Sequence, residues 1–486
     1  MKRLNFYQII FILTAVLILL FKLSVSQPAH VDEIFFKAPA VSWASGTGWR
    51  SPEEPNYGGW QPPLNDVFAS YPPVYPFLFS CCIKVFGFSW RVCAGYDAIV
   101  HTLLAGVLVF FLRSVLPSRP VIAWLAGWLF LLSGNMPRPD QLAMSFGYGS
   151  LALTFRTQRW TWRSLALSGL LFGFCLGTSV PCSVALAPLF GAVLLGRHCT
   201  FRQTANRVAI MGVVAAVTAL IIVLPVWLYH HGALEQNINA TADITNYEFT
   251  SSLGNLLRYW YPTLLAFGIF TLPGIWSLGV ILQKHEKQRL ASWLLWYGSA
   301  LLPLAFFFIK STSQGAYYWF FMPWLIAALF HFHLRETHLA RWWFVLLVAG
   351  FLPLAVTSLR SMLVAKLTVS DKRIDAFRQI IEDNVPKGAS VVCGGDYWWL
   401  LARRNRVYDI LDHAALRTDQ VDYIIVTGIG SGTADLHHAL PPFASDGHYQ
   451  LIHFTRETSL SSLFGIPLSR STSSPAPSVY RRKDTL

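Results

Sequence analysis

Residues 1–33, MKRLNFYQIIFILTAVLILLFKLSVSQPAHVDE, decide the fold expected for this chain. A basic start precedes an apolar run from Phe6 to Leu23, and two carboxylates, Asp32 and Glu33, follow it. The run of about 18 residues can span a bilayer and is longer than the apolar region of a cleaved signal peptide. We therefore expect a retained first transmembrane helix with two carboxylates just beyond the membrane.

The composition of the whole chain is typical of a protein with many such helices. Of its 486 residues, 54% are hydrophobic and 13% are charged, whereas soluble domains are about one-quarter charged. The net charge of +13 does not indicate a nucleic-acid partner, because basic residues of membrane proteins collect in cytoplasmic loops. We therefore expect a polytopic membrane protein that contacts membrane lipids and no nucleic acid.

Apolar stretches recur as far as residue 359 and predict an α-helical protein with about eleven transmembrane helices. The stretches lie near residues 6–24, 92–112, 120–136, 141–156, 164–180, 182–196, 208–229, 259–282, 291–309, 317–334 and 342–359. With a cytoplasmic N-terminus, five successive inside loops are rich in lysine and arginine, which favours this orientation. It puts the first long loop and everything after about residue 360 on the outer face of an inner (plasma) membrane.

We expect a transmembrane domain over residues 1–360, in which residues 25–91 form a long first outer loop. The apolar stretch 71–79 is rich in proline and aromatic residues and continues to Gly87. Aromatic residues favour the membrane interface, so this stretch predicts an amphipathic helix lying in the interface and not a further span.

A second, extracytoplasmic domain is expected over residues 361–468. Residues 371–384 have helical periodicity, and strands are expected at 389–393, 423–427 and 449–454. The alternation of helix and strand predicts a small α/β domain. Residues 469–486 begin with Ser-Arg-Ser-Thr-Ser-Ser-Pro-Ala-Pro-Ser and are low in apolar residues, which predicts a disordered tail.

The acidic pair Asp32 and Glu33 is the first candidate for catalysis. A carboxylate at the outer edge of the membrane can take a proton from a hydroxyl nucleophile as a general base. Neighbouring residues do not share a helix face, so we expect one of the two to point into a site. The alternative is a solvated pair that caps the next helix.

Two further elements with charged or aromatic residues are expected at the same outer face. Arg138 and Asp140 flank Pro139 where the third span ends, and an arginine fork suits a phosphate or a carboxylate. Lys310 precedes Tyr318 between the ninth and tenth spans, where a lysine can meet an anionic head group. The alternatives are an interfacial turn for the first element and an interfacial anchor for the second.

Other polar residues carry weaker signals. Arg91 and Asp97 lie near the outer start of the second span, where a lone charge more often snorkels to the surface than binds a ligand. The seven cysteines show no metal-ligand spacing. A divalent metal is possible but not indicated, and no cofactor is expected.

Taken together, these elements resemble the GT-C superfamily of membrane glycosyltransferases, which includes protein O-mannosyltransferases and the lipid A aminoarabinose transferase type. The resemblance covers residues 1–335 and rests on short motifs in the same order. The matching residues are Asp32, Glu33, Tyr71-Pro72-Pro73-Val74-Tyr75, Phe86-Gly87, Arg91, Arg138, Asp140, Lys310, Tyr318 and Pro323. The chain has no Asp-x-Asp motif in its first loop, which puts a metal in doubt.

The resemblance implies a transfer of a sugar from a polyprenyl phosphate to an extracytoplasmic lipid, polysaccharide or protein, with inversion. It implies that Asp32, or else Glu33, acts as the base or orients the acceptor, and that Lys310 contacts the lipid phosphate. Substrate binding is expected from Arg138, Asp140, Lys310, Tyr318, Tyr71 and Arg91. Alternatives are a transporter or flippase for a lipid-linked glycan and a non-catalytic subunit for assembly of an envelope polysaccharide. Transport predicts polar groups near mid-membrane, whereas these charges cluster at one surface.

Overall fold

The computed structural model divides the chain into two compact units. One contains residues 1–17, 69–74 and 99–359, and the other contains residues 18–68, 75–98 and 360–486. The structure describes residues 6–24, 31–49, 72–133, 138–156, 161–195, 201–244, 261–310, 315–333, 340–368, 371–393, 398–409, 421–427, 449–453, 462–463, 466–467 and 477–483. The statements below concern these residues.

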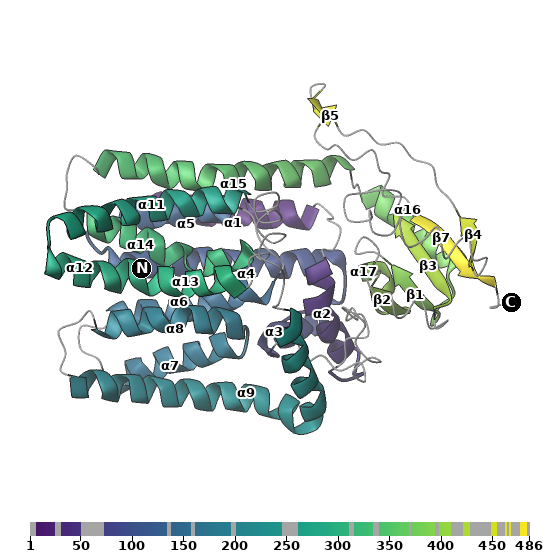
Figure 1. Cartoon of the computed structure of the whole chain (residues 1–486). Helices are drawn as coiled ribbons and strands as arrows, with labels where there is room; N and C mark the ends of the chain where they lie inside the picture. The colour runs from purple at the N-terminus through teal and green to yellow at the C-terminus, as the bar shows by residue number, and fades with distance from the viewer. Residues whose placement is uncertain are drawn as a thin grey trace. The chain divides into compact units, whose positions relative to one another are not determined.

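The first unit is helical. Each of the eleven predicted apolar stretches falls on a helix or a set of consecutive helices (Figure 1). The helices that match the first eight stretches are α1 (Phe6–Ser24), α4 (Trp90–Val115), α5 (Pro120–Leu132), α6 (Pro139–Arg156), α7 (Trp162–Leu176), α8 (Val180–Leu195), α9 (Phe201–Ile244) and α11 (Tyr261–Gln283). The stretch 291–309 falls on three consecutive helices, α12 (Lys287–Trp293), the π-helix η1 (Leu294–Gly298) and α13 (Ser299–Lys310). The stretch 317–334 falls on the 3-10 helix η2 (Gly315–Phe320) and α14 (Met322–His333), and the stretch 342–359 falls on α15 (Ala340–Thr368). Three of these helices, α1, α4 and α15, extend into the second unit.

Several of these helices have the length and apolar composition to cross a membrane. The described residues include four such spans, Phe6–Ser24, Trp90–Val115, Arg202–Leu228 and Thr263–Gln283, together with six shorter apolar helices. Many large apolar side chains of these helices are exposed in the isolated chain, among them Leu17, Leu220 and Trp276. A lipid environment removes the free-energy cost of that exposure, so the chain is an α-helical membrane protein.

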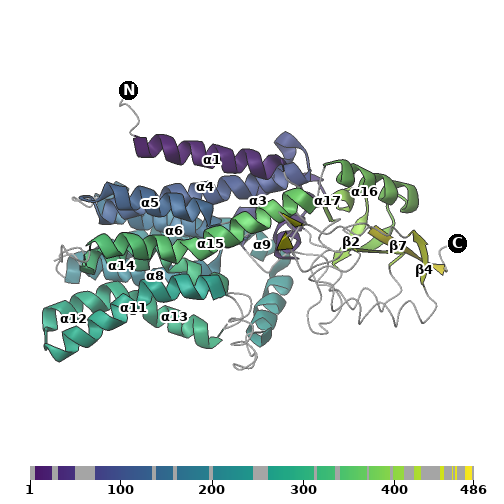
Figure 2. The ribbon, with the colours of Figure 1, turned by 90° about the horizontal axis from the view of Figure 1, so that it is seen from above.

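Glycines allow two pairs of helices to approach closely. A Cβ at Gly173 of α7 would lie 2.5 Å from Thr218 Cβ and 2.8 Å from the Ala215 carbonyl oxygen of α9, and α7 and α9 lie side by side in Figure 1. A Cβ at Gly127 of α5 would lie 3.3 Å from the Ala105 oxygen of α4, which runs beside it in Figure 2. Small residues at such contacts are typical of helices that pack within a membrane.

The second unit contains two helices of the first outer region, α2 (Val31–Ala44) and α3 (Val74–Phe86), of which Val74 belongs to the first unit. A helix is thus present within residues 71–87, as α3, and that it lies in the membrane interface stays a prediction. A turn follows at Gly87, whose φ of 78° lies in the left-handed region that glycine favours.

The rest of the second unit is a small α/β arrangement, as predicted. Its sheet has the order β2-β1-β3-β7-β4, in which β4 is Tyr449–His453 and β7 is Pro477–Arg482. Strand β1 (Ser390–Cys393) is parallel to β2 (Arg406–Asp409) and β3 (Tyr423–Thr427). The helix α16 (Asp371–Asn384) buries Phe377 and Ile381 and packs against β7. The short helix α17 (Trp398–Leu401) precedes β2, and a two-residue pair, β5 (Ser462–Leu463) and β6 (Ile466–Pro467), completes the described elements.

The prediction of a disordered tail over residues 469–486 is wrong for its second half. Strand β7 (Pro477–Arg482) lies inside the sheet, antiparallel to β3 on one side and to β4 (Tyr449–His453) on the other. Its Val479 is completely buried. The strand forms because two neighbouring strands satisfy its backbone groups, which the low apolar content of the tail does not reveal.

Candidate functional site

The predicted catalytic carboxylates lie in the first turn of α2. Asp32 and Glu33 are its second and third residues, and their side chains lie outside the described part of the chain. From Phe36 to Val41 the helix is buried, and this buried stretch includes Lys37. Because Asp32, Glu33 and Lys37 belong to one helix, the contacts that hold Lys37 also fix where the backbone of the acidic pair lies.

Lys37 is held by an ion pair with Asp97 of α4. Its Nζ lies 2.5 Å from Asp97 Oδ2 and donates a longer hydrogen bond of 3.5 Å to the Cys93 carbonyl oxygen. The same Nζ lies 5.4 Å from the centre of the Phe79 ring, in cation–π geometry. The lysine side chain has no exposed surface, and a lysine is almost never buried in this way without a partner.

Helix α3 joins the same cluster through Tyr75. The Tyr75 hydroxyl donates to Asp97 Oδ1 over 3.1 Å, and the Tyr96 hydroxyl donates to the Tyr75 carbonyl oxygen over 3.0 Å. Both carboxylate oxygens of Asp97 thus accept a hydrogen bond. The cluster of Lys37, Tyr75 and Asp97 ties α2, α3 and α4 together and fixes the helix that carries the acidic pair.

Sequence reasoning missed this cluster. The sequence predicts that Asp97, a charge near a helix end, snorkels to the surface, whereas the structure buries this carboxylate against Lys37. A charge that is paired inside the fold does not need to reach water, which is why the expectation for Asp97 was wrong. The available signal was a lysine within the apolar stretch 34–41, although no sequence pattern names its partner.

The structure pairs Arg138 with Asp140 at the start of α6. Arg138 Nε lies 3.0 Å from Asp140 Oδ2, and the Ser179 hydroxyl donates to Asp140 Oδ1 over 2.7 Å. The Arg138 side chain is 12% exposed and that of Asp140 is 7% exposed. Pro139 sits at the first helical position, where its missing N–H costs nothing. Asp140 therefore holds Arg138 in place, and a small part of the arginine side chain stays accessible to a ligand.

The other predicted site residues are distributed over both units. Lys310 ends α13, and its side chain lies outside the described residues. Tyr318 of η2 is buried, and the centre of its ring lies 5.5 Å from that of Phe267. Its hydroxyl has no hydrogen-bond partner within the described part of the chain. Tyr71 lies outside the described residues. Arg91 is exposed, and its guanidinium lies 5.1 Å from the Trp90 ring.

The first unit thus holds Arg138, Asp140, Lys310 and Tyr318, and the second holds Asp32, Glu33 and Arg91. That these residues converge on one pocket stays a prediction. Among the described residues, no group of three or more His, Cys, Asp or Glu side chains could hold a metal ion.

Comparison with known proteins finds solved structures that are similar to this chain. No family model and no curated protein matches it. Two solved structures of ArnT from Cupriavidus metallidurans match 97% of this chain and 97% of theirs. One is bound to undecaprenyl phosphate, with a TM-score of 0.53 and 14% identity, and the other is in the apo state, with a TM-score of 0.55 and 13% identity.

Proposed function

We propose that this chain, which has the GT-C fold, is a membrane glycosyltransferase that takes a sugar from a polyprenyl phosphate. The observation that carries the proposal is a likeness over 97% of both chains to a protein seen with undecaprenyl phosphate bound. A match of this extent includes both the membrane helices and the small α/β part. It favours a shared donor chemistry over a role in transport or assembly.

The acceptor would be an extracytoplasmic lipid, polysaccharide or protein with a free nucleophilic oxygen. The basic inside loops favour a cytoplasmic N-terminus. In that orientation, α2 and the C-terminal α/β unit face the outside of an inner (plasma) membrane, where the sugar would be transferred.

The reaction would be a displacement at the anomeric carbon of the donor. The acceptor oxygen forms a bond to this carbon while the bond from the carbon to the phosphate oxygen breaks. The electron pair leaves with the polyprenyl phosphate, and Asp32 takes the acceptor's proton. Attack from the face opposite the leaving group inverts the configuration at that carbon. Glu33 is the second candidate for the base.

Basic side chains would stabilise the negative charge that grows on the leaving phosphate. Lys310 is the first candidate and Arg138 the second. Asp140, which itself accepts a hydrogen bond from Ser179, orients Arg138 through its other carboxylate oxygen, so the guanidinium would need little reorganisation to meet a phosphate. Tyr318, Tyr71, Arg91 and Asp140 would line or support the substrate site.

The proposal is tested with the purified full-length protein in detergent. It is given undecaprenyl phosphates that carry different sugars, with a membrane extract as the source of acceptor, and release of undecaprenyl phosphate is measured. We expect release with at least one donor, and a fall of about 10²- to 10⁴-fold for Asp32→Asn, the usual contribution of a general base. Asp383→Asn, which changes an exposed carboxylate of α16, is the matched control.

Two results would contradict the proposal at different points. No release from any donor by the folded wild-type protein would rule out this donor class. Release by Asp32→Asn at the wild-type rate, together with loss in Glu33→Gln, would transfer the role of base to Glu33. If neither change slowed release, neither carboxylate would take part in the reaction.

A further inference from the structure

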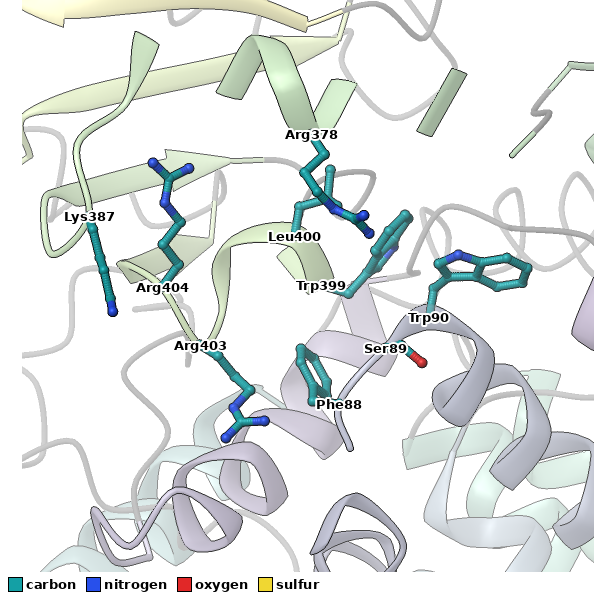
Figure 3. Close-up of a pocket in the computed structure, with 9 residues that line it drawn as sticks. All are labelled: Phe88, Ser89, Trp90, Arg378, Lys387, Trp399, Leu400, Arg403 and Arg404. Atoms are coloured by element: carbon teal, nitrogen blue, oxygen red, sulfur yellow. The ribbon is translucent and has the colours of Figure 1, made fainter. Parts of the chain in front are cut away.

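A cavity of about 430 Å³ lies in the second unit, where α17 and the turn after it meet the segment that leads into α4 (Figure 3). Its volume falls within the range of small-molecule sites, roughly 300–1,000 Å³. Four of its lining residues are cationic, three are aromatic, and none is acidic. The residues that line it are Phe88, Ser89, Trp90, Arg378, Lys387, Trp399, Leu400, Arg403 and Arg404.

Arg404 lines the cavity and is held in place by backbone carbonyls. Its Nη2 donates to the Val385 carbonyl oxygen over 2.6 Å and to the Glu382 carbonyl oxygen over 3.4 Å. Its Nη1 is buried and has no hydrogen-bond partner among the described residues. The guanidinium therefore keeps its positive charge at a fixed place beside the cavity.

The other three cations add positive charge to the cavity, and no acidic residue lines it. Lys387 and Arg403 are exposed, and both lie on the same side of the cavity as Arg404 in Figure 3. Arg378 Nη1 lies 3.3 Å from Asp375, but both side chains of this pair are largely exposed. Exposed pairs of this kind are weak, so Arg378 can also turn toward a ligand.

Indole rings form the opposite side of the cavity. The rings of Trp90 and Trp399 lie 6.5 Å apart at 55°, and Figure 3 shows them facing the three cations across the cavity. The Trp399 Nε1 donor is buried without a partner in the described part of the chain. The neighbouring Trp398 is completely buried and packs edge-on against Phe88 at 5.5 Å, which fixes α17 and with it the position of Trp399.

From this arrangement we infer that the cavity binds a phosphorylated sugar. Arginine and lysine donors suit phosphate oxygens, and indole rings offer a rigid apolar surface with one polar tip to a sugar ring. Inorganic phosphate alone would use only the cationic side, and an uncharged sugar would use only the aromatic side. The proposed transfer reaction does not require this site, so the inference goes beyond it.

The sequence contains a signal for this site that a search for carboxylates overlooks. Residues 398–404 read WWLLARR, which puts two tryptophans and two arginines within one short helix and its turn. Aromatic and basic residues this close in the chain can offer ring faces and positive charge to the same ligand. The partner ring, Trp90, comes from more than 300 residues earlier in the chain.

Direct binding to the full-length protein tests the inference without any turnover. The protein is placed in nanodiscs of phosphatidylcholine and titrated calorimetrically with glucose 6-phosphate, glucose and inorganic phosphate. We expect glucose 6-phosphate to bind about tenfold more tightly than phosphate, and glucose to give no binding at the same concentration. Arg403→Glu is expected to weaken binding of glucose 6-phosphate by at least about tenfold.

Two further variants separate the roles of charge and ring. Trp399→Ala should remove most of the advantage of glucose 6-phosphate over phosphate, because phosphate does not use the ring. Lys84→Glu makes the same change of charge sign on an exposed lysine of α3 that does not line the cavity, and it should leave binding unchanged. The inference is wrong if wild type does not bind glucose 6-phosphate, if phosphate binds equally well, or if Lys84→Glu weakens binding as much as Arg403→Glu.

A final comparison identifies where the phosphorylated ring comes from. Nanodiscs that also contain phosphatidylinositol 4-phosphate present such a ring on a lipid. If this lipid weakens binding of free glucose 6-phosphate in wild type, and does so less in Trp399→Ala, the cavity takes a lipid head group. If binding is the same in both kinds of nanodisc, the cavity takes a soluble sugar phosphate.

Discussion

Lys37 Nζ lies 2.5 Å from Asp97 Oδ2, and the lysine side chain is completely buried. Removing one member of such a buried ion pair takes away the opposite charge that the other member faces, which costs about 3–5 kcal/mol. We therefore expect Lys37→Met and Asp97→Asn each to lower the unfolding temperature of the detergent-solubilised protein clearly. Both changes should also slow sugar transfer, because Lys37 fixes the helix that carries Asp32.

The double variant Lys37→Met with Asp97→Asn is the sharper test of this pair. The asparagine keeps an acceptor for the Tyr75 hydroxyl, and neither remaining side chain carries a charge. We expect the double variant to be more stable than either single variant, since interacting residues give non-additive effects. Losses of stability that simply add would mean that the two charges contribute independently.

Arg138 should affect the binding of the donor lipid more than the fold. Its guanidinium is oriented by Asp140 and keeps part of its surface exposed. Arg138→Gln removes a charge-assisted donor, so we expect about a tenfold higher KM for the undecaprenyl-phosphate sugar. Ser179→Ala should raise KM less, because it removes only one of the two hydrogen bonds that hold Asp140.

The control for Arg138 is an arginine with a similar local partner but different surroundings. Arg289 of α12 pairs with Glu286 over 2.9 Å at an exposed site, in a region that the charge pattern puts on the cytoplasmic face. Arg289→Gln should leave KM for the donor unchanged. Equal effects of Arg138→Gln and Arg289→Gln would argue against a phosphate contact at Arg138.

The membrane helices and most of the α/β unit could be predicted from the sequence because their signals are local. Long apolar stretches predict helices, and the range 371–384 predicted from its periodicity is that of α16. The pairing of Lys37 with Asp97 could not be predicted, since it joins residues 60 positions apart and no periodicity connects them. Asp140 shows both cases: its ion pair with Arg138 is local, whereas its bond to Ser179 depends on how α6 packs.

The close contact of α7 with α9 predicts that Gly173 does not tolerate a side chain. A Cβ there would lie 2.5 Å from Thr218 Cβ and 2.8 Å from a backbone oxygen, so the two helices must move apart. Overpacking of this kind costs about 1–3 kcal/mol, and we expect Gly173→Ala to lower the unfolding temperature. Gly191→Ala in α8 is the control, because a Cβ there meets nothing within 4 Å. Equal destabilisation by both changes would mean that helix packing at Gly173 is looser than the structure indicates.

Strand β7 makes the end of the chain necessary for the sheet. It lies between β3 and β4, so a chain that ends at residue 469 leaves the inner edge of β3 without a partner and β4 without its neighbour. We expect this truncation to speed amide hydrogen exchange in Tyr423–Thr427, since the N–H groups that bond to β7 then face solvent. A chain that ends at Lys483 keeps the whole strand and should exchange as the full-length protein does. Unchanged protection of β3 in the shorter chain would show that β7 is not needed for the sheet. If amide protection is lost only in the second unit, β7 stabilises that unit and the membrane helices are not sufficient to do so.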